Sequence, residues 1–529
     1  MQGSNDEHAG RDETASHKSQ IGGMAPEDFR TLGYRMVDYL CDYLQGCGER
    51  PVLSRSAPGE VYAAMPDAAP ERGLPDARGW DEVFADLERI VQPGLTHWQS
   101  PHFFGYFPCN GSGPAILGEL LSAGLGVQGM LWQTSPACTE VEMRVMDWMA
   151  DLLGLPDAYR FDRSAGRGGG VIQGTASEAA LIALVAARRR AVDRGADPAS
   201  VCVYTSEQAH SSILKAAMIA GLAMDAEDRS RLRLIPTDAQ HAMDARALGD
   251  AVSADVAAGL VPCFIAATAG TTSAGAVDPL GASAAALREA DPACGDAVNP
   301  RGWLHVDAAY AGAACVCPEY RGMLDGVEHA DSFCFNPHKW LLTSFDCDCF
   351  WTSDAAGLTR ALSITPEYLR NTASDAGAVV DYRDWQAPLG RRFRALKLWF
   401  VLRHFGAEGL RAHIRGHVRL GELFEAWVEA DERFELAAPR SLNLVCFACK
   451  QAPGEPADAA DQRTAALMAA VNETGRAYMT HTKLPTADGG SRYVIRFCPG
   501  ATGVEEQHVR AAWDLINAAA SKLMERPTA

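Results

Sequence analysis

Residues 331–351, "DSFCFNPHKWLLTSFDCDCFW", place one lysine between two apolar segments. Residues 332–335 alternate like a half-buried strand, and residues 340–342 are apolar again. An ammonium buried without a partner is costly, and loss of its proton leaves a neutral, nucleophilic amine. Lys339 is therefore expected to be paired, to extend to solvent or to be reactive.

On both sides of this stretch, residues 110–352 alternate between helix-like segments and short apolar runs. The runs are "VCVY" at 201–204, "CFIAAT" at 263–268, "WLHVD" at 303–307 and "SFCF" at 332–335. Such alternation predicts an α/β domain, in which helices cover a mainly parallel sheet.

The rest of the chain is divided by composition. We expect a disordered tail at 1–25, a helical dimerisation segment at 26–110, a large α/β domain at 111–396 and a small C-terminal α+β domain at 397–529. Within the large domain, residues 353–384 are rich in Ala, Gly, Ser, Thr and Asp and are predicted to form a mobile loop.

The overall composition excludes several classes of partner. The 529 residues carry a formal net charge of -19, which argues against nucleic acid and anionic lipid as partners. Residues 1–23 contain no apolar core like that of a signal peptide, and no apolar run is long enough for a membrane helix, so we expect a cytoplasmic protein.

The fifteen cysteines are then expected to be reduced thiols. "CDC" at 347–349 and "CFAC" at 446–449 lack a second ligand pair at zinc-finger spacing. We interpret them as buried small hydrophobic residues and expect no metal site.

Ligands of open α/β sheets gather at the carboxyl ends of strands. After "GGGVIQ", Thr175 and Glu178 have the spacing of a capping box at the start of an apolar helix. This predicts either a plain helix cap or a phosphate cradle made of first-turn N–H groups and the hydroxyls of Thr175 and Ser177.

Other strand ends carry further polar side chains. His210 follows one strand and is either a capping or core histidine or a ring that stacks on a bound heteroaromatic. Thr271 and Thr272 lie in a glycine-flanked turn, where turn chemistry is the alternative. Asp307 ends a buried strand, where a carboxylate needs a cationic partner such as a protonated ring nitrogen.

Taken together, these groups indicate one cofactor. A phosphate cradle, a stacking ring, a carboxylate for a pyridine nitrogen and a buried amine for an aldehyde are the features that bind pyridoxal 5′-phosphate. Lys339 must lose its proton to form the imine, which burial promotes.

The sequence also resembles the pyridoxal-phosphate group II decarboxylases, and in particular the aromatic-L-amino-acid decarboxylases. The resemblance spans residues 26–520 and is carried by "SPHFFGYFP", "SPACTEVE", "GGGVIQGTASEA", "QAHSSILKA", "HVDAAYAGAA", "NPHKWLL", "FDC" and "WQAPLGRRFR". It implies the fold type I of pyridoxal-phosphate enzymes, like that of aspartate aminotransferase.

The resemblance also implies roles for single residues. Lys339 binds the cofactor aldehyde, Asp307 contacts the pyridine nitrogen, Ala309 packs beneath the ring and His210 stacks above it. The implied phosphate and cofactor contacts are Thr175, Ala176, Ser177, Thr272, Asn336 and His338.

The resemblance places the substrate between two subunits of a homodimer. The implied substrate pocket consists of Trp98, Tyr106, Phe107, Pro108, Gln128, Met130 and Gly390. Gln128, Met130 and Cys109 differ from the residues usual in aromatic decarboxylases. A glutamine there needs a hydrogen-bond partner such as an indole N–H or a phenol.

Tyr368, in "TPEYLRN", lies in the predicted loop and corresponds to the catalytic tyrosine of the decarboxylases; without the resemblance it reads as a packing anchor. Related aldehyde synthases carry phenylalanine there, or asparagine in place of the stacking histidine. We therefore expect decarboxylation of an aromatic L-amino acid to the amine. Aldehyde synthesis is the alternative, and an aminotransferase or a non-catalytic relative are more distant possibilities.

Overall fold

The computed structural model describes residues 21, 23–74, 77–165, 167–291, 302–364 and 379–524. The chain divides into two compact units, Met1–Ser100 and Pro101–Ala529. The first unit contains the helices α1 (Pro26–Gly46), α2 (Glu60–Ala64) and α3 (Trp80–Asp86). The predicted helical segment is thus helical, and its unit ends at Ser100, ten residues before the expected boundary at 110.

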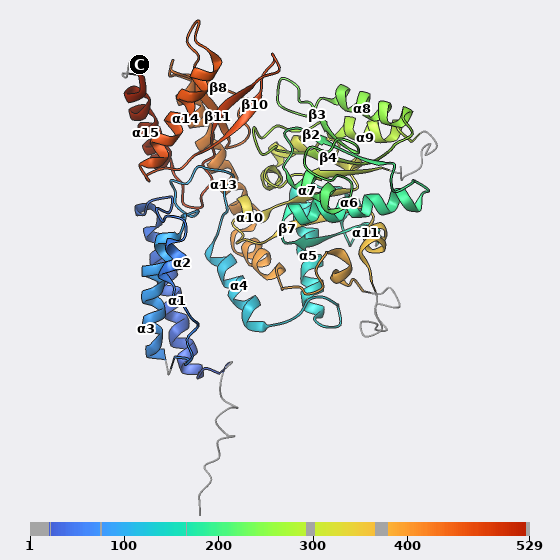
Figure 1. Cartoon of the computed structure of the whole chain (residues 1–529). Coiled ribbons are helices and arrows are strands. Elements are labelled where there is room, and N and C mark those ends of the chain that lie inside the picture. Colours follow the sequence, from blue (N-terminus) through green and yellow to red (C-terminus); the bar gives the residue numbers. More distant parts are fainter. Residues whose placement is uncertain are drawn as a thin grey trace, which may run out of the picture. The chain divides into compact units, whose positions relative to one another are not determined.

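The second unit is built on a seven-stranded sheet with the order β1-β7-β6-β5-β4-β2-β3 (Figure 1). Its strands are β1 (Gly169–Gln173), β2 (Val201–Ser206), β3 (Leu232–Ile235), β4 (Val261–Thr268), β5 (Trp303–Asp307), β6 (Ser332–Phe335) and β7 (Asp348–Thr352). Strands β2 to β6 pair in parallel, whereas β7 runs antiparallel to both of its neighbours. The predicted mainly parallel sheet is confirmed.

Helices cover both faces of this sheet. One face packs against α6 (Ala176–Asp193), α7 (Ser212–Ile219) and α11 (Ala355–Leu362). The other packs against α5 (Pro136–Leu153), α8 (Ala245–Ala257) and α9 (Leu280–Glu289). All four residues of β6 are consequently buried, so the interpretation of 332–335 as a half-buried strand was wrong.

Two further helices matter for the site and its surface. The short α10 (Pro337–Trp340) follows β6 directly, and α4 (Gly113–Leu125) packs along α13 (Ala395–Glu429). Helix α13 breaks at Gly406, whose φ of 61° lies in the left-handed region that glycine tolerates. The expected boundary at 396/397 falls inside this helix.

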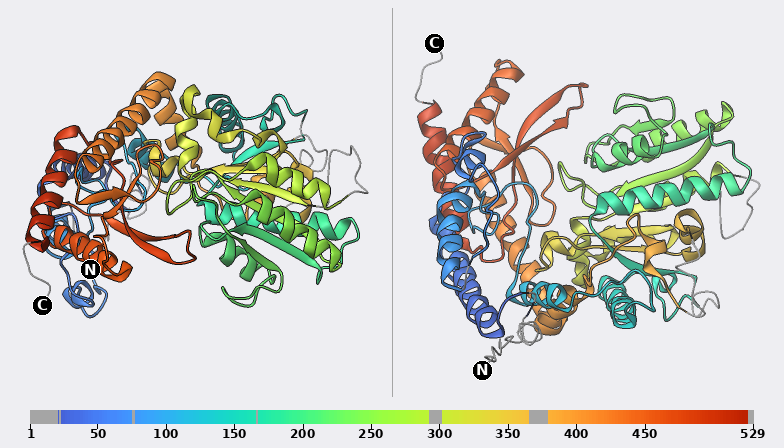
Figure 2. Two further views of the ribbon diagram at one scale, coloured as in Figure 1. Left: turned by 90° about the horizontal axis from the view of Figure 1, so that it is seen from above. Right: turned by 60° about the horizontal axis from the view of Figure 1, so that its bottom comes forward.

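The C-terminal part forms a second, antiparallel sheet of the order β10-β11-β9-β8. Its elements are β8 (Phe434–Leu436), β9 (Val445–Cys449), α14 (Ala457–Glu473), β10 (Thr480–Pro485), β11 (Ser491–Phe497) and α15 (Glu506–Met524). Figure 2 shows these orange and red elements grouped apart from the green and yellow sheet. The predicted strands in "LNLVCFAC" and "YVIRFC" are confirmed.

The predicted loop at 353–384 needs correction. Residues Ala355–Leu362 form α11, and the side chain of Asp354 caps this helix by accepting from the N–H of Gly357 at 2.8 Å. Residues Tyr382–Trp385 form a short 3₁₀ helix. Residues 365–378, and Tyr368 with them, lie outside the described residues.

Candidate active site

Lys339 lies on α10, just past the carboxyl end of β6. Its backbone is fixed, because its N–H donates to the carbonyl of Asn336 at 3.0 Å and its own carbonyl accepts from the N–H of Asn110 at 3.1 Å. The adjacent Trp340 indole donates to Nδ1 of His417 at 2.8 Å. These bonds fix the position from which the lysine side chain extends. Its Nζ lies 5.3 Å from the centroid of the Phe107 ring.

Burial lowers the pKa of Lys339 from its ordinary value. The negative charge of Asp307 opposes this effect, and the positive charge of Arg496 adds to it. Asp307 ends β5, is only 3% exposed, and accepts the N–H of Ala309 at 2.9 Å. The amine therefore has a raised neutral fraction, as a nucleophilic lysine requires.

Two histidines use the same ring nitrogen, Nδ1, to accept a backbone N–H. Nδ1 of His338 accepts the N–H of Cys347 at 2.9 Å, and Nδ1 of His210 accepts the N–H of Ser212 at 3.2 Å. Burial lowers the pKa of His338 to about 3. Loss of water lowers the pKa of His210 as well, and that ring interacts with the charges of Asp307 and Lys339. Each neutral ring then carries its proton on Nε2, as a donor.

The start of α6 is the predicted position of the phosphate cradle, and the capping box predicted there is wrong. The Thr175 side chain makes no cap hydrogen bond, and Glu178 accepts instead from the N–H of Gly174 at 3.1 Å. The hydroxyl of Thr175 and the first-turn N–H groups of Ala176 and Ser177 are thus not used by a capping box. A helix N-terminus with such donors suits a phosphate.

Arg496, on β11, is a residue that the sequence reasoning missed. Its guanidinium is 4% exposed and lies 4.9 Å from the centroid of the Phe107 ring. Nε donates to the carbonyl of Ser273 at 3.0 Å and Nη1 to the carbonyl of Tyr106 at 3.2 Å, whereas Nη2 has no acceptor within the described residues. The sequence did contain a signal for it: Arg496 is a charged residue inside the apolar run "YVIRFC", just as Lys339 is a charged residue between two apolar segments.

The substrate-side residues fall into separate groups. Phe107 stacks on Tyr310 with 3.8 Å between ring centroids, and Pro108 packs against Gly500. Tyr106 has a backbone φ of 51°, in the left-handed region. Trp98 belongs to the first compact unit.

Gln128 and Gly390 form the second group. The Gln128 amide oxygen lies 3.7 Å from the position that a Cβ of Gly390 would take, and it accepts the N–H of Arg391 at 3.1 Å. Both residues are exposed in the isolated chain. Close by in sequence, the carbonyl of the half-buried Met130 accepts the N–H of Arg383 at 3.0 Å.

The remaining predicted residues occupy the expected turns. Thr272 is exposed in the turn after β4, and Ala309 is half-buried after β5. The cysteines of "CDC" and "CFAC" are buried, which confirms their interpretation as small apolar residues. Within the described ranges, no group of three or more His, Cys, Asp or Glu side chains is arranged to hold a metal ion. Nor does any helix there have the length and apolar content needed to cross a membrane.

Comparison with known proteins identifies the family. Residues 58–450 match the model of the pyridoxal-dependent decarboxylase conserved domain. The chain belongs to the pyridoxal-dependent decarboxylases. It is 47% identical to the phenylacetaldehyde synthase of Arabidopsis thaliana over 509 residues, which cover 95% of this chain and 98% of the relative. It is 44% identical to tryptophan decarboxylase 2 of Oryza sativa subsp. japonica, with coverages of 95% and 96%.

Solved structures give the same result. The crystal structure of Oryza sativa TDC with PLP and tryptamine aligns with a TM-score of 0.88 and 41% identity, over 96% of this chain and 100% of that one. This pyridoxal-dependent decarboxylase therefore has fold type I and is a carboxy-lyase of the aromatic amino acid group that uses pyridoxal 5′-phosphate.

The residues present fit that cofactor. Lys339 offers an amine with a lowered pKa, and Asp307 offers a buried carboxyl group at the neighbouring strand end. The N-terminus of α6 and the Nε2–H of His338 offer donors for a phosphate. The side chain of Ala309 is small enough to leave room for a flat ring.

Proposed function

We propose that this decarboxylase converts an aromatic L-amino acid to the corresponding amine and carbon dioxide. The observation that carries the proposal is the Lys339 amine, whose pKa burial lowers, in the electrostatic field of Asp307 and Arg496. When bound, pyridoxal 5′-phosphate supplies an electron sink for the bond that breaks at the substrate α-carbon.

Each residue of the site has one task in this proposal. Lys339 supplies the neutral amine that binds the cofactor aldehyde, and Asp307 holds the proton of the pyridine nitrogen. His210 covers the ring. The phosphate is held by Thr175, Ala176, Ser177, Thr272, Asn336 and His338.

Arg496 binds the α-carboxylate of the substrate. Its buried Nη2 lacks an acceptor among the described residues, and a guanidinium–carboxylate hydrogen bond is among the strongest that proteins form. The Arg496 side chain is held by Ser273 and Tyr106 and can therefore fix the orientation of the carboxylate relative to the Lys339 amine. That orientation decides which bond of the α-carbon breaks.

The reaction breaks the bond between the α-carbon and the carboxylate, releases carbon dioxide and adds one proton to the α-carbon. Tyr368 is the proposed donor of that proton, since a phenol can act as a general acid when its surroundings tune it. Because Tyr368 and His210 are both present in the sequence, protonation and release of the amine is the proposed outcome.

A second candidate function is favoured by the 47% identity to phenylacetaldehyde synthase. An aldehyde synthase couples decarboxylation to oxidation by dioxygen and releases the aldehyde, ammonia and hydrogen peroxide. Amine and aldehyde products therefore separate the two functions directly.

The test is to incubate the holoenzyme with tryptophan, 5-hydroxytryptophan, dopa, tyrosine and phenylalanine and to measure amine, aldehyde and peroxide together. We expect amine as the main product, and Tyr368→Phe should divert flux toward aldehyde. Tyr62→Phe, at a highly exposed tyrosine of α2, is the matched control. Aldehyde and peroxide in equal amounts from the unaltered enzyme would favour the second function.

The orientation of the Gln128 amide favours an aromatic substrate whose ring bears a hydroxyl group. Only the amide oxygen of Gln128 can accept the N–H of Arg391, so this bond fixes which end of the amide is which. The Nε2–H₂ group is then the donor beside Gly390. A phenol oxygen can accept from it, whereas an indole N–H cannot. We therefore favour tyrosine, dopa or 5-hydroxytryptophan, in a pocket that also includes Tyr106, Phe107, Pro108 and Met130.

A homodimer completes this pocket in the proposal. Gln128 and Gly390 are exposed in the isolated chain, which suits residues that reach into the site of a second copy. The neighbouring helix α4 has four exposed leucines on one face, at helical spacing: Leu117, Leu120, Leu121 and Leu125.

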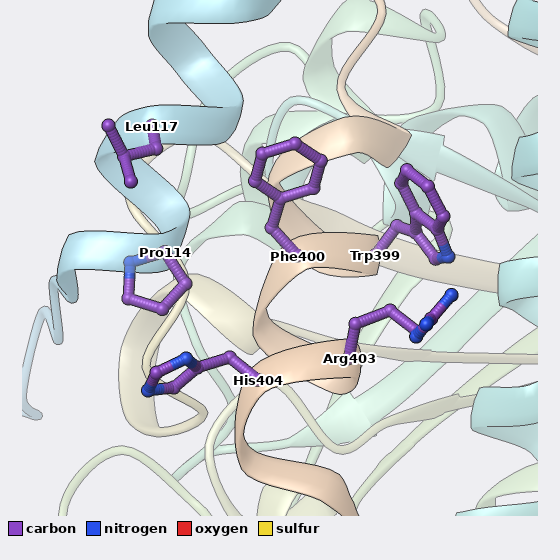
Figure 3. Close-up of a pocket in the computed structure, with 6 residues that line it drawn as sticks. All are labelled: Pro114, Leu117, Trp399, Phe400, Arg403 and His404. Atoms are coloured by element: carbon purple, nitrogen blue, oxygen red, sulfur yellow. The ribbon is translucent and has the colours of Figure 1, made fainter.

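This face borders a groove of about 380 Å³ between α4 and α13. Figure 3 shows Pro114 and Leu117 on one side and Trp399, Phe400, Arg403 and His404 on the other. Large exposed apolar patches usually mark interaction sites. A second copy of this chain is the proposed occupant, because it would cover the leucines and bring Gln128 to the partner site at the same time.

A further inference from the structure

A second buried carboxyl group lies close to the cofactor site. Asp348 opens β7, is 0% exposed and is paired in register with Gln173 of β1. On the other side of β7, Phe335 pairs with Cys349. The ladder ends at that pair, and the next residue on each segment is Asn336, just past β6 at the start of α10, and Asp348. Gln173 and Asp348 are thus paired on neighbouring strands, and Asn336 follows the end of β6 on the other side of β7; these three residues are called the row below.

The side chains of this row face α6. Asp348 and Phe350 are two residues apart on one strand and so point to the same side of the sheet. Phe350 belongs to the apolar cluster that packs against α6. Gln173 is separated by one residue from Thr175 at the start of α6, so the row lies close in the chain to the residues assigned to the phosphate.

This row contains acceptor atoms without donors. Both carboxyl oxygens of Asp348, the amide oxygen of Gln173 and the amide oxygen of Asn336 are buried and have no donor in the part of the chain that the structure describes. The amide nitrogen of Gln173 already donates to the carbonyl of Trp385 at 2.6 Å. Buried polar atoms nearly always have partners, so the row lacks a proton donor.

The charges around Asp348 also disfavour its ionised form. The groups with the largest influence on it are Asp307 on β5, Cys347 just before β7, Glu178 on α6 and Lys339 on α10. Lys339 is the only cation of this set, and burial lowers its own pKa. Burial and the charge of Asp307 raise the pKa of Asp348 well above its ordinary value.

We propose that Asp348 is a neutral carboxylic acid, which donates its proton to the amide oxygen of Gln173 or Asn336 and adds no negative charge to the field that Asp307 exerts on Lys339. One proton supplies the missing donor and removes a second negative charge from the site. Asp348 is thus a positioning residue that orients Asn336 and keeps Lys339 from being stabilised as an ammonium. The proposal concerns the cofactor site and does not depend on which product is released.

A second buried aspartate provides a matched contrast. Asp278 is 1% exposed, but its carboxylate accepts the N–H groups of Thr268 and Met243, each at 2.8 Å. Burial raises the pKa of Asp278 to only about 6. At pH 8 the two carboxyl groups should therefore differ in charge, although both are buried.

The test is infrared spectroscopy of the holoenzyme at pH 8. We expect a carboxylic acid C=O stretching band that shifts when the protein is grown with ¹³C-labelled aspartate, disappears in Asp348→Asn and persists in Asp278→Asn. The isotope shift is measured on the unaltered sequence, so it also decides the case in which Asp348→Asn does not fold. Absence of a protonated aspartate at pH 8, or a band that survives in folded Asp348→Asn, overturns the proposal.

A second measurement tests the positioning role of Asp348 through the absorption and retention of the bound cofactor. The amide of Asp348→Asn is neutral and can donate, so the pH midpoint of the visible absorption of the bound cofactor should match that of the unaltered enzyme. Asp348→Leu, which is neutral but cannot donate, should weaken cofactor retention because the amide that accepts the Asp348 proton loses its donor. If Asp348→Asn displaces the midpoint while Asp348→Leu retains the cofactor normally, a charged Asp348 is the correct description.

Discussion

Nζ of Lys339 lies 5.3 Å from the centroid of the Phe107 ring, on which Tyr310 also stacks. The amine therefore lies close to an apolar surface made of aromatic rings. Burial lowers the pKa of Lys339, although the negative charge of Asp307 opposes this effect. An aromatic face alone attracts the charged form of an amine. Burial is the largest influence on this pKa and outweighs the opposing charge of Asp307, so Lys339 is prepared to act as a nucleophile.

Lys339→Ala should abolish the visible absorption that pyridoxal 5′-phosphate acquires when a lysine of the protein binds it. Lys215→Ala, at an exposed lysine of α7, should retain the full absorption. Absorption spectra after removal of unbound cofactor test this expectation. A normal spectrum of Lys339→Ala would show that another amine binds the aldehyde.

Arg496→Lys should raise KM for the amino acid by roughly ten- to a hundredfold, because a hydrogen bond between charged groups contributes about 1.5–3 kcal/mol. A lysine keeps the charge but loses the planar set of donors. The control is the affinity for the product amine, which has no carboxylate and should bind both proteins equally. An equal loss of affinity for amine and amino acid would indicate a structural role instead.

The strands of the large sheet were predictable because buried parallel strands consist of continuous apolar runs, as in "CFIAAT" and "SFCF". Lys339 and Asp307 stood out because each is an ionisable group at the end of such a run. Long-range contacts were not predictable. Nothing in the local sequence shows that Asp348 lies opposite Gln173, or that Arg496 lies over Phe107, since each pair meets only after folding.

Two local predictions failed for the same physical reason. The spacing of Thr175 and Glu178 fits a capping box, but Glu178 bonds to the N–H of Gly174 and leaves the hydroxyl of Thr175 without a capping role. The composition of 353–384 is typical of a loop, but Asp354 caps α11 and Leu358 is fully buried in the apolar cluster beside α6. In both cases the local structure was decided by packing and side-chain contacts, which override the preference indicated by residue spacing or composition.

Low pH should destabilise the fold through buried histidines. Burial lowers the pKa of His305 to about 4, from an ordinary value near 6.5. The unfolded chain binds the proton between these values and the folded chain does not, so stability is complete above pH 6.5 and falls as the pH drops toward 4. The contribution of this one group is about 3 kcal/mol. Urea unfolding from pH 7 to pH 4 should show a shallower decline for His305→Gln, and an unchanged slope would exclude His305 as a cause.

Gln128→Leu should reduce the preference for tyrosine over phenylalanine by about three- to tenfold, because one hydrogen bond contributes about 0.5–1.5 kcal/mol. The measured quantity is the ratio of kcat/KM for the two substrates. Phenylalanine serves as the internal control, since it has no oxygen to accept from the Gln128 amide. A ratio that stays constant would show that the amide does not face the substrate ring.

A charge on the leucine face of α4 should separate the proposed dimer. Leu120 is 58% exposed in the isolated chain, and in the dimer Leu120→Asp would bury an unpaired carboxylate. We expect monomers by sedimentation, and loss of activity together with the dimer, because Gln128 and Gly390 no longer reach a partner site. Ile219→Asp, at a 60% exposed position of α7, is the matched control and should leave both properties unchanged. If Leu120→Asp sediments like the unaltered protein, α4 is not the contact, and the leucines require another partner.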